Sequence, residues 1–280
     1  MLFKWVTEMT EEMVSIILPT YNREKEIDRA VRSILQQTYD KYEVIIVDDG
    51  STDRTEEVVK RIADDRVQYI RLEHNHGAAY ARNVGICASK YNYIAFLDSD
   101  DEWNPAKLEL QIHQLGKAAR EVGLVYCRMS GKPENEERFY MPPYECLKES
   151  LEGDMFCFLL WRNIIGAPAM LVRRECLESV GLFKESLPCL EDYELVLRIA
   201  EKWKIAFVDD VLVEVHRTPN SLSGRIVEQL MVQCYFVSKY RQKMTVFGIL
   251  EIVQEEILRI ADLHGIQEEV RELLKRDFEL

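Results

Sequence analysis

The chain has 280 residues, of which 47% are hydrophobic and 30% are charged, and its formal net charge at pH 7 is -13. This composition is ordinary for a globular protein with a core of its own. The acidic excess argues against nucleic acid as the main partner, because phosphate backbones bind basic faces. A nucleotide stays compatible with this charge, since a bound metal ion neutralises a diphosphate locally.

The cysteines and the hydropathy pattern concern the cellular compartment. No uncharged apolar run approaches the length of a membrane span, and no signal peptide is recognised. We therefore expect a cytoplasmic protein, and contact with the inner face of the membrane stays open. The seven cysteines contain no Cys-x-x-Cys pair, which favours reduced thiols over a disulfide framework or a zinc site: Cys87, Cys127, Cys146, Cys157, Cys176, Cys189 and Cys234.

The first hundred residues alternate short apolar runs with amphipathic segments, after a loose leader over residues 1–12. This alternation predicts a parallel sheet with covering helices. Helices are expected from near Arg23, where Asn22 can cap the first turn, from Asp53, and over Gly77–Ala88. Strands are expected at Val14–Leu18, Tyr42–Val47, Val67–Leu72 and Tyr93–Leu97.

The rest of the chain alternates less regularly. Residues 129–145 form a connection rich in Gly, Pro and charge, and the pattern beyond Ser221 is helical to Leu280. Helices are expected after Pro105 and from about Glu191 to Trp203. Further strands are expected at Val122–Cys127, Ala169–Val172, Ile205–Val208 and Val211–Val215.

The strand expected at Tyr93–Leu97 ends in three acids, Asp98, Asp100 and Asp101. Ligands of open α/β sheets bind at the carboxyl ends of strands. Carboxylates converging without a cation repel each other, so the cluster predicts a hard divalent metal. The alternative is an acidic turn that caps the helix beginning near Pro105.

Six ordered sequence blocks over about the first 215 residues resemble family 2 glycosyltransferases of the GT-A fold. The blocks are Ser-Ile-Ile-Leu-Pro-Thr-Tyr-Asn-Arg (15–23), Ser-Ile-Leu-Gln-Gln-Thr (33–38), Val-Asp-Asp-Gly-Ser-Thr-Asp (47–53), Ala-Arg-Asn-Val-Gly (81–85), Phe-Leu-Asp-Ser-Asp-Asp (96–101) and Leu-Glu-Asp-Tyr-Glu-Leu (190–195). The resemblance implies an α/β fold with a mostly parallel central sheet flanked by helices. It also implies a catalytic domain over residues 1–220, with a nucleotide-binding half (13–128) and an acceptor-binding half (129–220). Residues 221–280 would be a helical C-terminal extension.

The implied reaction is inverting transfer of a sugar from a nucleotide-sugar, expected to be a UDP-sugar, to a glycan or lipid-linked acceptor. Thr20 and Tyr21 would wrap the base, and Asp49 would accept the uracil N–H. Arg82 would meet a phosphate with its planar, doubly donating group; a structural ion pair to a strand-end aspartate is the alternative.

The resemblance also assigns the acids of the strand-end cluster. Asp100 would ligate Mn²⁺ or Mg²⁺ against the diphosphate, and Asp98 would hydrogen-bond the ribose or the donor sugar. His216 is similar to a histidine that completes the metal site in the family, although a lone histidine is as readily structural. Asp101 stays unassigned.

Asp192 aligns with the catalytic base of the family. A helix N-terminus stabilises an ionised carboxylate and lowers its basicity, so desolvation on substrate binding would have to restore it. The simpler interpretation is a pair of first-turn acids, Glu191 and Asp192.

Two other functions compete with sugar transfer. A nucleotidyltransferase that makes sugar nucleotides has a related sheet, but residues 19–23 lack the Gly-rich loop it normally carries. A non-catalytic scaffold with the same fold is disfavoured by the intact aspartates. The C-terminal helices could contact a membrane surface through aromatic and basic residues around Tyr235, pack back onto the catalytic domain, or form a homo-oligomer.

Overall fold

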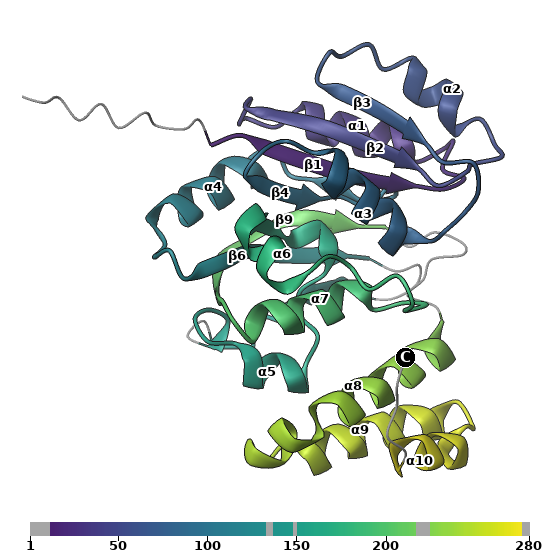
Figure 1. The fold of residues 1–280 in the computed structure, drawn as a ribbon, viewed down its shortest axis with the longest axis vertical. Helices are drawn as coiled ribbons and strands as arrows, with labels where there is room; N and C mark the ends of the chain where they lie inside the picture. The colour runs from purple at the N-terminus through teal and green to yellow at the C-terminus, as the bar shows by residue number, and fades with distance from the viewer. Residues whose placement is uncertain (1–11, 133–136, 148–149, 217–224, 276–280) are drawn as a thin grey trace, which may run out of the picture.

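The computed structural model describes residues 12–132, 137–147, 150–216 and 225–275. Nearly all of the leader expected over residues 1–12, and the domain boundary expected near residue 220, lie outside these ranges. The described chain forms one mixed sheet with helices on both faces and three further helices at its C-terminal end (Figure 1).

A nine-stranded sheet forms the centre, in the order β3-β2-β1-β4-β8-β6-β9-β5, with β7 paired to β6. The first four strands of the chain are parallel where they pair, whereas β8 runs antiparallel to both β4 and β6. The expected mostly parallel sheet therefore describes the first half of the chain, and the second half is mixed. The strands are β1 (Val14–Thr20), β2 (Tyr42–Asp48), β3 (Val67–Arg71), β4 (Tyr93–Phe96), β5 (Glu102–Trp103), β6 (Val122–Gly131), β7 (Phe139–Met141), β8 (Leu171–Arg173) and β9 (Lys204–Val215).

The helices connect these strands. The chain steps outward from β1 to β3 through α1 and α2, then returns through α3 to β4 on the other side of β1. Because such crossovers are right-handed, α3 covers the face opposite to α1 (Figure 1). The helices are α1 (Ile27–Leu35), α2 (Thr55–Lys60), α3 (Ala78–Ala88), α4 (Lys107–Lys117), α5 (Phe156–Trp161), the 3₁₀ turn η2 (Ala167–Ala169), α6 (Arg174–Val180), α7 (Glu191–Ala200), α8 (Ile226–Val246), α9 (Leu250–Leu263) and α10 (Gln267–Lys275).

Several elements differ from the sequence expectation. The strand expected to end at Cys127 continues as β6 to Gly131, because it pairs with β9 along this whole length. The two strands expected at 205–208 and 211–215 are one strand, β9, whose register shifts opposite Arg128. The short helices α5 and α6 were not expected, since six and seven residues are too few to show a helical period.

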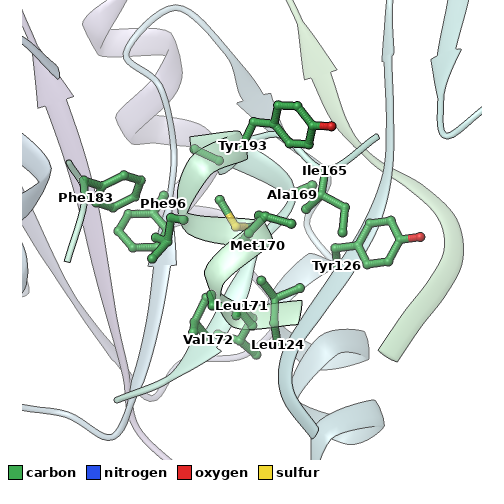
Figure 2. Close-up of a cluster of buried hydrophobic side chains, with 14 of the residues drawn as sticks. Phe96, Leu124, Tyr126, Ile165, Ala169, Met170, Leu171, Val172, Phe183 and Tyr193 are labelled. Atoms are coloured by element: carbon green, nitrogen blue, oxygen red, sulfur yellow. The ribbon is translucent and has the colours of Figure 1, made fainter. Parts of the chain in front are cut away.

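Apolar side chains of several elements form one buried cluster (Figure 2). Phe96 of β4 lies edge-on to Phe183, with ring centroids 5.2 Å apart, and Tyr126 of β6 packs on Phe207. Tyr193 of α7 is buried in the same core, and its hydroxyl donates to the Leu159 carbonyl. This packing fixes the start of α7 against the sheet.

The C-terminal helices pack on the αβ part through α7. Lys239 of α8 donates to the buried carboxylate of Glu194, with Nζ 2.9 Å from Oε1, and Lys243 pairs with Glu201. Tyr235 and Phe236 of α8 are buried, as the packing alternative required, whereas the basic side chains of Lys239 and Lys243 stay at the surface and reach acids of the α7 region. None of the described helices is long and apolar enough to cross a bilayer.

Candidate active site

A cavity of about 650 Å³ opens at the carboxyl ends of β1, β2 and β4, a volume typical of small-molecule sites. It lies where the strand order reverses between β1 and β4, which is the usual ligand position in open α/β sheets. All eight site residues expected from the sequence line it: Thr20, Tyr21, Asp49, Arg82, Asp98, Asp100, Asp192 and His216. Their convergence from positions nearly 200 residues apart is the main structural fact about the site.

The loop after β1 forms one wall. Thr20 is buried and Tyr21 is 42% exposed, so the Tyr21 ring offers a face toward solvent and the cavity. Asn22 has a left-handed backbone, with φ 51°, and its side-chain oxygen accepts the Thr52 N–H at 2.8 Å. The expected helix cap is therefore wrong: α1 begins at Ile27, and Asn22 ties the β1 loop to the β2 loop instead.

Asp49 follows β2 and is 3% exposed. Its two carboxylate oxygens accept the backbone N–H groups of His76 and Gly77, at 2.8 and 2.7 Å, just before α3. Burial raises the pKa of Asp49, and the two N–H groups oppose that rise. The residue thus has a structural role that the sequence did not reveal, in holding the entry to α3, and each oxygen keeps a lone pair for another donor.

Arg82 of α3 is buried and bridges two acids. Its guanidinium lies 2.6 Å from Asp98 Oδ1 and 2.6 Å from Glu191 Oε1. Burial alone would lower the pKa of Arg82, but the two carboxylates outweigh burial and hold it above its ordinary value. The ion-pair alternative describes this geometry, and it joins the acidic loop after β4 to the start of α7.

The acids after β4 form a negative pocket floor. Burial raises the pKa of Asp101 well above its ordinary value, and the charges of Asp98 and Asp100 raise it further. Arg23 lies 3.5 Å from Asp100 Oδ2, and Arg29 donates to the Asp100 carbonyl at 2.5 Å. Arg23 thus places a positive charge beside one acid of the floor.

His216 follows β9 and lies beside the same loop. Its backbone N–H donates to Asp101 Oδ1 at 2.9 Å, and its ring Nε2 lies 2.8 Å from Glu102 Oε1. In this arrangement His216 has a structural role, because it links the end of β9 to the acidic loop. Asp101, which had no expected role, is the acceptor that holds β9's end to the acidic loop.

The donor set at the floor suits a hard cation, because it consists of carboxylate oxygens. Burial raises the pKa of Asp101 most, and the charges of Asp98 and Asp100 raise it further; a dication at the floor would relieve this repulsion. Within the described ranges, no three His, Cys, Asp or Glu side chains form a complete metal-binding group. The residues fit an ion that takes one or two carboxylates from the protein and its remaining ligands from a substrate diphosphate and water.

Asp192 is the second residue of α7 and lines the same cavity as Asp49. Its Oδ2 accepts the Ala167 N–H at 3.1 Å, and its Oδ1 accepts the Tyr193 N–H at 2.8 Å. Burial and then the charge of Glu191 raise its pKa to about 6, against the lowering effect of Arg82 and the two N–H groups. From the sequence we expected the helix N-terminus to lower the basicity of Asp192 until a substrate binds. In the structure, burial already outweighs that effect.

The backbone before Asp192 is strained. Leu190, the residue that caps α7, adopts a left-handed conformation with φ 57°, which is uncommon for a branched apolar side chain. Such strain persists only where the surroundings enforce it. Here the buried ring of Tyr193 and the Arg82–Glu191 ion pair fix α7 on either side of Asp192.

Several cavity residues were not singled out from the sequence. Glu191 was treated only as a first-turn acid, and its ion pair to Arg82 spans 109 positions, a pairing that no local pattern indicates. Arg225 and Gln229 of the α8 region also line the cavity, although the C-terminal helices lie outside the sequence blocks. The Asn-Arg at 22–23 was part of the first block, which was the available signal for Arg23.

Comparison with known proteins places this geometry in a family. The sequence model described as glycosyl transferase family 2 matches residues 15–180. The putative teichuronic acid biosynthesis glycosyltransferase TuaG of Bacillus subtilis is 32% identical over 216 residues, covering 76% of this chain and 82% of TuaG. A shorter match links residues of this chain to the Escherichia coli UDP-Glc:alpha-D-GlcNAc-diphosphoundecaprenol beta-1,3-glucosyltransferase WfgD, at 42% identity over 109 residues, 39% of this chain and 43% of WfgD.

The fold itself is similar to that of a solved archaeal enzyme. The mannosyltransferase PcManGT of Pyrobaculum calidifontis, solved in complex with GDP-Man and Mn²⁺, superposes with a TM-score of 0.66 at 19% identity. The match covers 95% of this chain and 76% of PcManGT. It therefore includes the C-terminal helices that lie beyond the family match.

Proposed function

This chain belongs to glycosyl transferase family 2, and on that basis we propose that it transfers a sugar from a UDP-sugar to a lipid-linked or other glycan acceptor, with inversion at the anomeric carbon. The observation that supports the proposal most is the convergence of Asp49, Asp98, Asp100 and Asp192 on one cavity. A nucleotidyltransferase and a non-catalytic scaffold find no support in the family match.

The donor occupies the half of the cavity formed after β1 and β2. Tyr21 stacks on the base, and Asp49 accepts the N3–H of uracil with a lone pair left over from its two backbone bonds. This acceptor favours uracil over cytosine, which has no N–H at that position. WfgD is named for a UDP-linked donor, which agrees with the preference, whereas PcManGT is bound to GDP-Man.

The acidic floor takes the diphosphate and the sugar. Asp98 accepts from a donor hydroxyl with the oxygen that Arg82 leaves free, and Arg82 keeps that carboxylate in place. Asp100, with His216 beside it, would hold Mn²⁺ or Mg²⁺, which when bound stabilises negative charge on the leaving diphosphate. Arg23 adds a further positive charge next to Asp100.

Asp192 receives the proton of the attacking hydroxyl. The acceptor oxygen forms a bond to the anomeric carbon as the bond between that carbon and the phosphate oxygen breaks, and the departing UDP keeps the electron pair. A carboxylate with a pKa of about 6 is mostly ionised at pH 7.5, yet more basic than an exposed aspartate. Burial thus matches Asp192 to its role.

The acceptor enters from the side of α7 and α8. Met129, Met141, Pro168 and Arg225 line the cavity and offer it apolar contacts and a cation. WfgD is named for an acceptor that carries a diphosphate on a lipid, and Arg225 suits such a group. Polysaccharide synthesis at the cytoplasmic face of the membrane is the setting that this acceptor implies.

The proposal is tested by ligand-induced stabilisation of the whole chain. UDP-Glc and UDP-GlcNAc, each with Mn²⁺, should raise the melting temperature, since a ligand at about 100 times its dissociation constant adds about 2.7 kcal/mol. Chelator, or the variant Asp100→Asn, should remove most of this shift. Asp262→Asn, an exposed α9 residue, is the matched control that should keep it.

Other ligands distinguish the alternatives. Stabilisation by nucleoside triphosphates together with a sugar phosphate, and none by UDP-sugars, would indicate a nucleotidyltransferase. No stabilisation by any nucleotide sugar would contradict the donor assignment altogether.

A further inference from the structure

The 3₁₀ turn η2 supplies one of the two hydrogen bonds to Asp192. Its Ala167 N–H donates to Asp192 Oδ2 at 3.1 Å, and Pro168 lines the cavity. A single 3₁₀ turn of three residues has too few bonds of its own to fix its position. What holds η2 therefore decides where the Ala167 N–H points.

Two buried side chains that do not line the cavity hold η2 through hydrogen bonds. Trp103 of β5 donates its Nε1–H to the Pro168 carbonyl at 3.0 Å. Gln111 of α4, which is 0% exposed, donates its amide to the Ala169 carbonyl at 2.7 Å. Two consecutive carbonyls of the turn are thus held by two separate elements.

Lys107 orients both of these side chains. Its Nζ donates to Gln111 Oε1 at 2.7 Å and lies 4.0 Å from the centre of the Trp103 ring. Because the Gln111 oxygen accepts from the ammonium, the Gln111 NH₂ group must face the Ala169 carbonyl. Lys107 therefore fixes the orientation of the Gln111 amide.

Burial of the Lys107 ammonium in the core is unfavourable for folding. Lys107 is 0% exposed, burial lowers its pKa to about 8, and among the described residues no carboxylate lies within ion-pair distance of it. A buried lysine without a counterion destabilises a fold unless its hydrogen bonds compensate. Within the described residues, the Lys107 ammonium hydrogen-bonds the Gln111 amide and lies over the Trp103 indole, the two groups that hold η2. This points to a role in the site and not in stability.

We propose that Lys107, Gln111 and Trp103 are positioning residues that fix η2 and thereby hold the Ala167 N–H against Asp192. This inference rests on the proposed role of Asp192 as the base. Trp103 lies three positions after Asp100, so the segment that carries the acidic floor also carries one support of the base.

The expected effect reaches Asp192 through one hydrogen bond. The charged groups that face Asp192 are Glu191 on its own helix and Arg82 on α3, which is paired with Asp98. None of the three positioning residues acts on it directly. Since the Ala167 N–H lowers the pKa of Asp192, loosening η2 should raise that pKa and weaken its alignment.

The test compares variants of the full chain in the UDP-release assay with acceptor, over pH 5 to 9. Trp103→Phe removes the donor to Pro168, and Lys107→Met/Gln111→Leu removes the ammonium and the amide together, so that no buried charge is left unpaired. Tyr126→Phe is the matched control, because it removes a buried donor to the Leu151 carbonyl, 2.9 Å away, and leaves the hydrogen bonds to η2 in place.

We expect kcat to fall about fivefold to tenfold in both test variants, in line with the loss of one aligning hydrogen bond. The donor KM should stay within about twofold, and the acidic midpoint of kcat/KM should rise by about half a pH unit. Tyr126→Phe should lower the melting temperature but leave kcat and the midpoint unchanged.

The outcomes distinguish a failure of the positioning role from a failure of the proposed role of Asp192 as the base. If Asp192→Asn abolishes the acidic limb but the test variants leave kcat and the midpoint at wild-type values, the positioning role is wrong and the base role stands. If the wild type has no acidic limb that depends on Asp192, both are overturned. Equal kinetic losses in the test variants and in Tyr126→Phe would also overturn the positioning role.

Discussion

The raised pKa of Asp192 predicts that Asp192→Asn makes the protein more stable while it stops turnover. In the folded protein the pKa is about 6 against an ordinary 3.8, so the folded state holds this proton more tightly than the unfolded state. Wild-type stability therefore falls as pH rises from about 4 to about 6, and the ionised carboxylate destabilises the fold by about 3 kcal/mol above that range.

Asparagine removes the charge but gives up one acceptor. One of the two backbone donors, Ala167 or Tyr193, then faces an NH₂ group, at a cost of about 1–2 kcal/mol. The net gain in the free energy of unfolding at pH 7.5 is about 1–2 kcal/mol, or about 3 °C in melting temperature for a chain of this size. Below pH 4, where the carboxyl is protonated in both states and the charge contribution is absent, the variant should be less stable than the wild type by that cost of about 1–2 kcal/mol.

Urea unfolding of both proteins at pH 4 and pH 7.5 measures this difference. Asp53→Asn is the contrasting variant: burial raises the pKa of Asp53, but hydrogen bonds from Thr55 and the Glu24 N–H outweigh it and lower the pKa. The Asp53→Asn substitution should therefore lower the free energy of unfolding at pH 7.5. An Asp192→Asn variant that is no more stable than wild type at pH 7.5, or whose gain does not depend on pH, would refute the burial argument.

Three further predictions concern the cavity. Asp100→Asn should abolish Mn²⁺-dependent donor turnover at an unchanged melting temperature of the free protein, and undiminished activity in chelator would remove Asp100 from the metal site. Asp49→Asn should weaken UDP binding about tenfold by calorimetry while CDP affinity stays nearly level; an equal loss for both nucleotides would point to its bonds before α3 instead. Arg225→Ala should raise the KM of a diphosphate-bearing acceptor more than that of the donor, and the reverse order would place Arg225 on the donor.

Local sequence patterns were sufficient to predict the strands of the parallel half of the sheet. Each strand there is a short apolar run that stops at polar residues, as at Asp48 and Asp98, and these stops mark the carboxyl edge where ligands bind. Thr20, Tyr21, Asp49, Asp98 and Asp100 could be named because their sequence blocks lie at such an edge. Arg82 on α3, Asp192 at the start of α7 and His216 after β9 were named with the help of the family resemblance. Their meeting in one cavity follows from the strand order.

The contacts that define their chemistry could not be derived in this way. The basicity of Asp192 depends on its burial and on Glu191 beside it, against the Ala167 N–H, whereas the sequence offered only its place at a helix start and its alignment with the family. Asn22 caps no helix because β1 and β2 are neighbours, which brings Thr52 within its reach. Side-chain partners across elements are set by tertiary packing, which overrides the local signal.

The central claim, that Asp192 is the base of a UDP-sugar transferase, is tested most directly by UDP release from UDP-Glc and UDP-GlcNAc with a GlcNAc-diphosphate-lipid acceptor and Mn²⁺. The wild type should release UDP and form a product of inverted anomeric configuration. Asp192→Asn should bind UDP as tightly as the wild type but turn over at least about 100-fold more slowly. Near-wild-type turnover by that variant, or retention of configuration, would contradict the account.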